Sequence, residues 1–346
     1  MKARHWIMKA AVLRGPKDLH IKEVSKPVPE YGEVLVRVRA TAICGTDISI
    51  FDGKTEVDYP RILGHESAGE VAELGEGVKN LKVGDRVAMS PTSYCGICLD
   101  CMRGDTQICK NGGLFGREFD GTFAEYAVLA ENRAFKFPDD MSYADATTLN
   151  VLSTVVHAQR KVYIFPNSSV VVIGEGTSGL LHSKISKLRG ADPVIGIDIK
   201  ESEWKLDLAK SLYGADYVLT ENVIEKVYEL TEGKGADFVI ECAGKGATWN
   251  LATELVRPGG TILAFGITSH SIENFNSYSI YYKDLEIIGS RAMQLIDWPI
   301  SIDLVKKGKI DIGTIITNRL PLEDLVKGFK MLQNPSQKVL RIVIEI

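Results

Sequence analysis

Hydrophobic and polar positions follow different patterns in the two parts of the chain. In residues 9–130, short apolar runs such as 33–44, 67–74 and 123–130 are separated by Gly, Pro and Asp. Short runs that end at turn residues are typical of β-strands. This part of the chain therefore predicts a β-rich body with loops.

After residue 142, helical runs alternate with apolar strands, which predicts an α/β region with a parallel sheet built from βαβ units. The predicted helices are 143–160, 178–190, 202–214 and 246–260, and the predicted strands are 168–176, 193–198, 216–220, 236–244 and 261–267. Beyond residue 289 the pattern predicts two more helices and a closing strand, at 298–308, 322–332 and 338–346.

The chain has 346 residues, of which 45% are hydrophobic and 25% are charged. This length is sufficient for two domains, each with its own core. The formal net charge of -4 gives no general electrostatic reason to bind nucleic acid or an anionic membrane. No apolar run approaches the roughly 20 residues that cross a bilayer, and the N-terminal stretch is too polar for a secretory signal. We expect a cytoplasmic protein.

Four of the six cysteines, Cys95, Cys98, Cys101 and Cys109, lie close together and are separated by two, two and seven residues. Disulfides are rare in a reducing compartment, so the cluster favours metal binding. Four cysteines with no open position suit a structural zinc ion, which would order a lobe at 94–110 that has no apolar core of its own. The alternatives are an iron–sulfur cluster and a lobe without metal.

Gly174, Gly176 and Gly179 form a GxGxxG motif directly after an apolar strand and at the start of a helix. The glycines allow a tight turn and close approach of the backbone to a pyrophosphate, whose charge the helix N-terminus favours. Asp198 ends the next strand, where a carboxylate accepts hydrogen bonds from both ribose hydroxyls and repels a 2′-phosphate. NAD is therefore favoured over NADP, although Lys200 softens this preference; a glycine-rich turn without ligand is the alternative. The predicted dinucleotide-binding residues of this segment are Gly174, Gly176, Thr177, Ser178, Gly179, Asp198 and Lys200.

The β-rich part contains a second candidate metal site. Cys44, His65 and Glu66 offer a thiolate, an imidazole and a carboxylate, a mixed set that suits a zinc ion with an open position. Taken singly, a cysteine such as Cys44 is more often a buried core thiol, and a histidine such as His65 more often a loop residue. Their occurrence together favours the metal site.

The motifs around these residues resemble the zinc-dependent medium-chain alcohol dehydrogenase family over essentially the whole chain. They are "ICGTD", "LGHESAGEVAELGEGVKNLKVGDRV", the four-cysteine lobe, "GEGTSG" with Asp198, "ECAG" and "GSR". The "ECAG" segment and residues 297–329 are most similar to the polyol and threonine dehydrogenase branch. The resemblance implies a GroES-like catalytic domain, residues 1–150 and 289–346, that is split around a Rossmann domain at 151–288. It also implies a homotetramer or dimer.

The resemblance further assigns chemistry to individual residues. A catalytic zinc ion would lower the pKa of a bound alcohol as it lowers that of water, and NAD would accept the hydride. Thr46 matches the hydroxyl that takes the substrate proton and passes it towards the nicotinamide ribose, and Asp47 is placed to orient His65. Arg291 matches a basic residue near substrate and coenzyme, and Cys242 is expected to pack beside the coenzyme.

Two positions depart from the family pattern. Asn150 stands where relatives place a metal-binding Glu, Asp or Cys. We expect Cys44, His65 and Glu66 to bind the catalytic zinc, with water or substrate as the fourth ligand. Asn150 would hydrogen-bond that water or bind weakly; the alternative is a site that holds zinc poorly or is empty. Ser49 stands where many relatives carry the histidine that completes the proton relay, and its hydroxyl can hand the proton to water.

We therefore predict an NAD-dependent enzyme with two zinc ions per chain, one catalytic and one structural. It would convert a secondary alcohol, such as a polyol, a sugar derivative or a hydroxyamino acid, reversibly into a ketone. One alternative is an NADPH-dependent carbonyl or quinone reductase that uses no zinc, against which Cys44, His65 and Asp198 argue. The other is a dinucleotide-binding protein with a degraded catalytic zinc site, which Asn150 and Ser49 favour.

Overall fold

A computed structural model describes residues 7–268, 271–272 and 274–346. The chain divides into two compact units, residues 1–151 with 294–346 and residues 152–293. The first six residues of the catalytic domain expected at 1–150 lie outside the described residues. No described helix is both long enough and apolar enough to span a membrane.

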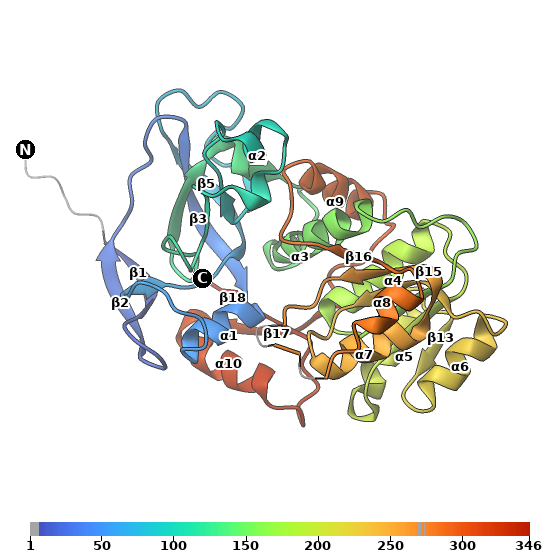
Figure 1. The fold of residues 1–346 in the computed structure, drawn as a ribbon. Helices are drawn as coiled ribbons and strands as arrows, with labels where there is room; N and C mark the ends of the chain where they lie inside the picture. The colour runs from blue at the N-terminus through green and yellow to red at the C-terminus, as the bar shows by residue number, and fades with distance from the viewer. Residues whose placement is uncertain (1–6, 269–270, 273) are drawn as a thin grey trace, which may run out of the picture. The chain divides into compact units, whose positions relative to one another are not determined.

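The first unit is built on a seven-stranded sheet to which distant parts of the chain contribute. Its order is β10-β6-β5-β3-β18-β17, and β9 also pairs with β3. β18 lies antiparallel to β3, with Val343 opposite Ala42, so the C-terminal segment joins the sheet formed by the first part of the chain (Figure 1). The strands are β3 Glu33–Ala42, β5 Glu66–Leu74, β6 Arg86–Met89, β9 Tyr126–Ala130, β10 Ala134–Lys136, β17 Ile316–Pro321 and β18 Arg341–Glu345.

Smaller elements complete this unit. A three-stranded sheet has the order β2-β1-β4, and β7 pairs with β8. An apolar cluster that includes Leu13, Ile50 and Phe329 packs α1 and α10 against the strands. The strands are β1 Ile7–Leu13, β2 Leu19–Ser25, β4 Arg61–Ile62, β7 Thr92–Ser93 and β8 Gly113–Leu114. The helices are α1 Gly45–Phe51, α2 Leu99–Met102, α9 Asp297–Lys306, α10 Leu325–Gln333 and the first part of α3 Tyr143–Arg160.

The second unit is a six-stranded parallel sheet with helices on both faces. Its order is β13-β12-β11-β14-β15-β16, so the strand order reverses at β11. This is the Rossmann order, in which ligands bind beyond the carboxyl ends of the strands beside the reversal. The strands are β11 Val170–Ile173, β12 Val194–Ile197, β13 Tyr217–Leu219, β14 Ala236–Glu241, β15 Val256–Ala264 and β16 Glu286–Gly289. The helices that follow α3 are α4 Thr177–Leu188, α5 Glu203–Ser211, α6 Val223–Leu230, α7 Gly246–Leu255 and α8 Tyr278–Tyr282.

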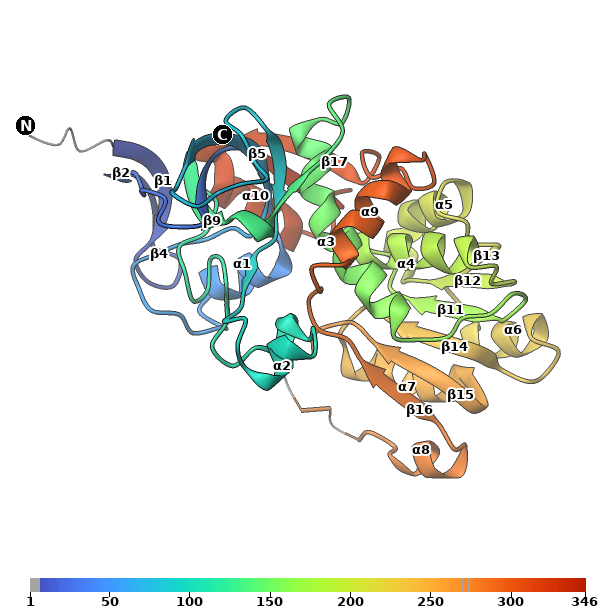
Figure 2. The ribbon, with the colours of Figure 1, turned by 90° about the horizontal axis from the view of Figure 1, so that it is seen from above.

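Strand β11 shows why this sheet needs helices on both faces. Val170 and Val172 pack into one apolar cluster with Ala158 of α3, whereas Val171 and Ile173 pack into another with residues of α6 and α7. Figure 2 shows α3 and α7 on opposite sides of the sheet. A strand buried on both faces has an unbroken apolar run, which is the pattern seen in the sequence. The predicted α/β fold class is confirmed.

The prediction from the sequence lacks α1, α2, α6, α8 and β17. The helix predicted at 246–260 is wrong after Leu255, because β15 begins at Val256 and Pro258 and the glycines that follow do not favour a helix. α1 and α6 have seven and eight residues, too few for a helical period to stand out, and α1 follows the apolar run of β3 almost directly. β17 alternates between half-buried and exposed positions and contains polar residues, so its apolar pattern is weak. Pairing with β18 therefore contributes to making this segment a strand.

Candidate active site and metal centres

Two neighbouring strands bring Cys44, His65 and Glu66 together. Glu66 opens β5 opposite Ala42, the last residue of β3, so all three side chains lie at one end of this strand pair. Their ligand atoms lie within 4.8 Å of one another. A thiolate, an imidazole and a carboxylate at this spacing fit a zinc ion that keeps an open position.

The buried carboxylate of Asp47 connects the two segments that carry these side chains. It accepts hydrogen bonds from the backbone N–H groups of Cys44, at 2.9 Å, and Gly64, at 3.0 Å. Its Oδ1 lies 3.3 Å from Nδ1 of His65. Burial opposes a charge on His65, but Asp47 and then Cys44 raise its pKa well above the usual value. Because Asp47 occupies Nδ1, the other ring nitrogen of His65 is the one available to a metal ion.

Arg341, at the start of β18, is a partner of Glu66 that the sequence-based analysis missed. Its Nη2 lies 2.8 Å from Oε2 of Glu66, and both side chains are buried. The same Nη2 donates a hydrogen bond to the carbonyl oxygen of Thr147, at 3.0 Å. An arginine in an otherwise apolar closing strand is the signal for this pair, because a buried charge needs a partner. Glu66 is therefore shared between Arg341 and the position that suits a metal ion.

Asn150 lies beside the same site and points its amide nitrogen at the backbone. It belongs to α3, and its Nδ2 donates a hydrogen bond to the carbonyl oxygen of His65, at 3.1 Å. The side chain is buried. This bond holds the backbone of His65 in place and leaves Oδ1 as the Asn150 atom that would accept a hydrogen bond from a water molecule if a metal ion were bound at this site.

Hydroxyl groups follow the metal-binding cysteine along α1. Thr46 and Ser49 lie three residues apart and therefore on the same side of the helix. Oγ1 of Thr46 is 3.8 Å from Sγ of Cys44. Oγ of Ser49 is 2.8 Å from Oγ1 of Thr55, in the loop after α1. Thr55 was not predictable from the sequence, because a single threonine in a loop has no distinguishing pattern.

The other four cysteines converge in one lobe. This lobe contains α2, whose ribbon is labelled in Figure 2. Sγ of Cys95 lies 4.0 Å from that of Cys101 and 3.6 Å from that of Cys109, and the Cys98 and Cys109 sulfurs are 3.9 Å apart. Zinc–sulfur bonds of about 2.3 Å in a tetrahedron separate the sulfurs by about 3.8 Å, so the cluster has the size of a zinc site. Hydrogen bonds from the backbone of Ile97 and then Cys98 lower the pKa of Cys95 to about 6, which favours the thiolate that a metal needs.

In the second unit, the three motif glycines form the turn between β11 and α4. Gly174 has a φ of +95°, and a Cβ on Gly179 would lie 2.0 Å from the carbonyl oxygen of Gly174. Gly176 is the N-cap of α4, which begins with Thr177 and Ser178. Apart from its chain neighbours, no described atom lies within 4 Å of a Cβ added at Gly176. The turn is therefore closely packed at Gly174 and Gly179 and open at Gly176. An open position at the helix N-terminus is what a pyrophosphate needs in order to approach the backbone.

Asp198 follows β12 and lies at the same edge of the sheet as the motif. Its Oδ2 accepts a hydrogen bond from the backbone N–H of Glu175, at 3.1 Å, and its Oδ1 from that of Ile199, at 2.8 Å. These bonds hold the carboxylate beside the glycine turn, which is its place in a dinucleotide site. Nζ of Lys200 lies 3.6 Å from Oε1 of Glu221, and both side chains are exposed.

Glu175, between the first two motif glycines, is a buried acid that the sequence-based analysis missed. Its Oε1 accepts a hydrogen bond from Oγ of Ser183, at 2.7 Å. A Cβ on Gly196 would lie 2.6 Å from the same oxygen, so glycine in β12 leaves room for this side chain. Burial raises the pKa of Glu175 to about 8, with Ser183 opposing the shift and Asp198 adding to it. This shift favours the neutral carboxyl group, which avoids a second negative charge beside a pyrophosphate.

Cys242 and Arg291 occupy the ends of two other strands of this sheet. Cys242 follows β14 and packs partly against the apolar cluster that contains Val170. Burial, followed by the nearby carboxylates of Glu175 and Glu241, raises the pKa of Cys242 well above the usual value. A neutral thiol of this kind behaves as a small apolar group. Arg291 lies two residues beyond β16 and has an exposed side chain.

Comparisons with known sequences match both units. The family model of the alcohol dehydrogenase GroES-like domain matches residues 30–139, and that of the zinc-binding dehydrogenases matches residues 179–307. An L-threonine 3-dehydrogenase from Pyrococcus furiosus is 36% identical over 306 residues, which cover 86% of each chain. A sorbitol dehydrogenase from Halalkalibacterium halodurans is 32% identical over 333 residues, which cover 94% of this chain and 96% of that protein.

Solved structures share the whole architecture. A thermostable alcohol dehydrogenase from Pyrobaculum aerophilum, solved with cobalt and zinc, is 28% identical with a TM-score of 0.87 and covers 99% of this chain and 100% of its own. A proposed zinc-binding dehydrogenase from Sinorhizobium meliloti, solved with NADP, is 29% identical with a TM-score of 0.89 and the same coverage. These matches agree with the GroES-like and Rossmann domains that the sequence motifs imply.

Proposed function

Because the chain belongs to the zinc-binding alcohol dehydrogenase family, we propose that it oxidises a secondary alcohol reversibly to a ketone, with hydride transfer to NAD. The observation that carries this proposal is the convergence of Cys44, His65 and Glu66, with Asp47 behind them. The threonine and sorbitol dehydrogenases among the relatives favour a polyol, a sugar derivative or a hydroxyamino acid as the substrate.

The chemistry requires a group that acidifies the alcohol. A neutral alcohol is a poor hydride donor, because positive charge develops on its carbon as hydride leaves, whereas the alkoxide is a good donor. When held by Cys44, His65 and Glu66, zinc supplies the Lewis acid that lowers the pKa of the alcohol. Thr46 takes the proton, since its hydroxyl lies next to the sulfur of Cys44. Asp47 keeps His65 in the tautomer that leaves the other ring nitrogen to the metal.

The purified protein is expected to contain two zinc ions per chain, one in the four-cysteine lobe and one at the Cys44 site. Elemental analysis after mild dialysis without added metal tests this, followed by NAD reduction with a panel of polyols, sugar alcohols and L-threonine. Two zinc ions together with turnover support the proposal. One zinc ion, no turnover and tight NADH binding would identify a dinucleotide-binding protein. Zinc-independent reduction of quinones by NADPH would identify a carbonyl or quinone reductase.

NAD rather than NADP is the proposed coenzyme. The carboxylate of Asp198 is held beside the glycine turn, where it repels a 2′-phosphate. Lys200, the residue that softens this preference, lies against Glu221, which offsets its charge. The ratio kcat/KM for NAD is therefore expected to exceed that for NADP by roughly tenfold or more. Initial rates with both coenzymes measure the ratio, and a preference for NADP would contradict this role of Asp198.

Thr55 extends the polar path that starts at Thr46 and Ser49. Ser49→Ala and Thr55→Val are each expected to lower kcat by roughly tenfold to hundredfold and to shift its pH profile, because each removes a hydroxyl from the path by which the proton leaves. Thr55→Ser is the matched control, since it keeps the hydroxyl. If the pH profiles of Ser49→Ala and Thr55→Val match that of the unmodified protein, neither residue belongs to the proton path.

We infer that two or four copies of the chain assemble into a homo-oligomer in the cytoplasm. β16 is an edge strand, and its Ile287 is 37% exposed. Helix α8, which precedes β16 in sequence, exposes Tyr281 and Tyr282. An edge strand with exposed apolar side chains is suited to pairing with another copy. The six free cysteines fit a reducing compartment.

A further inference from the structure

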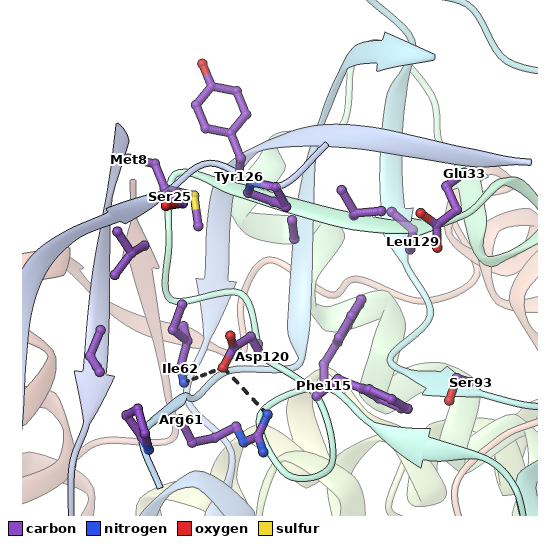
Figure 3. A pocket seen from close by; sticks show the side chains of 18 of the residues that line it. Met8, Ser25, Glu33, Arg61, Ile62, Ser93, Phe115, Asp120, Tyr126 and Leu129 are labelled. Atoms are coloured by element: carbon purple, nitrogen blue, oxygen red, sulfur yellow. Dashed lines mark hydrogen bonds and ion pairs between the residues drawn. The ribbon is translucent and has the colours of Figure 1, made fainter. Parts of the chain in front are cut away.

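The first unit contains a cavity to which the proposed reaction assigns no role. Its volume is about 490 Å³, which is the size of a small-molecule site. Strands β1, β2, β4 and β9 and the segment 115–121 form its walls, and none of Cys44, His65 and Glu66 lines it. Figure 3 shows Arg61, Ile62 and Asp120 on one side of the cavity and Met8, Ser25 and Tyr126 on the other.

The walls of this cavity are mainly apolar. Met8, Val24, Ile62, Phe115 and Leu129 contribute side chains to it. Such a surface favours the hydrocarbon part of a ligand, because the transfer of apolar surface from water to an apolar environment is favourable. The polar groups are few, and this is typical of pockets in which one or two contacts set the orientation of the ligand.

Arg133 is a buried cationic group in the wall of this cavity. The residue is only 7% exposed, and its Nε and Nη2 both donate hydrogen bonds to the carbonyl oxygen of Ser90, at 3.2 and 2.9 Å. The guanidinium lies 4.8 Å from the centre of the Phe115 ring. Among the described residues no carboxylate lies within ion-pair distance of it; Tyr94, and then Glu33 in the cavity wall, attract the guanidinium from beyond that distance. Burial lowers the pKa of Arg133 to about 10.

Arg61 differs, because it already has an acidic partner. Its Nη1 lies 3.7 Å from Oδ1 of Asp120, which also accepts a hydrogen bond from the backbone of Ile62, at 3.1 Å (Figure 3). Asp120 is thus committed to the wall of the cavity and does not reach Arg133 as an ion-pair partner. Arg133 donates two hydrogen bonds to one carbonyl oxygen, and these compensate its buried positive charge only in part. Such a guanidinium favours the binding of an anion.

We propose that this cavity binds a monocarboxylate with an apolar chain, whose carboxylate accepts hydrogen bonds from Arg133 and whose chain lies against Met8, Val24 and Leu129. A carboxylate supplies the negative partner that the Arg133 guanidinium lacks, and its two oxygens match the planar geometry of the guanidinium. The hydrocarbon chain of the ligand supplies the apolar surface that packs against the apolar walls of the cavity. This site is separate from the Cys44 cluster, so its occupation does not depend on the proposed oxidoreductase activity.

Calorimetric titration of the zinc-loaded full chain with sodium octanoate tests the proposal, with octanamide as the neutral probe of the same chain length. Octanoate is expected to bind at least about tenfold more tightly than octanamide. Arg133→Met should weaken octanoate binding by at least about tenfold, whereas Arg39→Met, which removes a guanidinium outside the cavity, should leave it unchanged. Val24→Trp fills the cavity without changing a charge and should weaken octanoate binding equally, which keeps the test valid if Arg133→Met fails to fold.

Three results would overturn the site. The first is that octanoate does not bind to the unmodified chain. The second is equal affinity of octanoate for the unmodified chain and for Val24→Trp. The third is loss of octanoate binding in a Cys44→Ala variant with an intact cavity, which would place the carboxylate at the metal of the Cys44 cluster instead. None of these results bears on whether the chain oxidises alcohols, because that is measured separately by NAD reduction.

Discussion

Replacing Cys44 with alanine is expected to abolish alcohol oxidation and to lower the zinc content from two ions per chain to one. Cys44 provides the thiolate of the mixed cluster, and His65 and Glu66 alone leave a metal ion with two protein ligands of that set. A catalytic metal supplies several kcal/mol of stabilisation to developing charge, and about 1.4 kcal/mol corresponds to a tenfold change in rate. The ratio kcat/KM should therefore fall by at least about 10³. Elemental analysis and NADH absorbance measure the two effects.

Cys242→Ala is the matched control for this variant. Cys242 lies in the second unit and belongs to neither cysteine cluster, so its replacement should keep both zinc ions. The local fold of Cys44→Ala should persist, because Asp47 binds the backbone N–H of residue 44 rather than its side chain. A Cys44→Ala protein that retains two zinc ions and full activity would show that the mixed cluster is not the catalytic site.

Gly179→Ala is expected to weaken NAD binding by at least about tenfold and to lower the melting temperature by several degrees. An added Cβ would lie 2.0 Å from the carbonyl oxygen of Gly174 and 2.9 Å from its carbonyl carbon, so α4 has to move away from β11. Overpacking of this kind costs about 1–3 kcal/mol. The same movement displaces the helix N-terminus that faces the pyrophosphate. Fluorescence titration with NADH and thermal unfolding measure the two effects.

Gly176→Ala distinguishes an effect on coenzyme binding from an effect on the stability of the fold. A methyl group at Gly176 meets no described atom within 4 Å apart from its chain neighbours, and φ there is -73°, so the melting temperature should stay unchanged. NADH binding should still weaken, because the backbone at this glycine is where the pyrophosphate approaches closely. If Gly176→Ala binds NADH as tightly as the unmodified chain, the glycine turn does not hold a pyrophosphate.

Long regular segments were predictable from the sequence. Helix α3 occupies residues 143–160, as its helical run predicts, and β11 and β12 coincide with apolar runs that end at the glycine motif and at Asp198. A long helix and a fully buried strand are recognisable from sequence, because the hydrophobic pattern repeats at each turn of the helix and at each residue of the strand. α1 has only seven residues and β17 is partly polar, so neither repeats a pattern often enough.

The sequence by itself determined the groups whose members lie close together along the chain. The four-cysteine lobe and the GxGxxG turn are recognisable from spacing, because a loop or a strand–helix turn brings such neighbours together whatever the rest of the fold does. Cys44, His65 and Glu66 were also recognisable, through the motifs that surround them. Their chemistry was therefore predictable before any contact was known.

Only the tertiary structure decided which distant side chains support these groups. Arg341 reaches Glu66 because β18 pairs with β3 and β3 pairs with β5. Asn150 bonds the backbone of His65 across 85 residues of sequence, and burial between β12 and α4 raises the pKa of Glu175. Strand pairing and burial depend on the whole chain at once, and a buried charge takes its state from the partners that this packing provides.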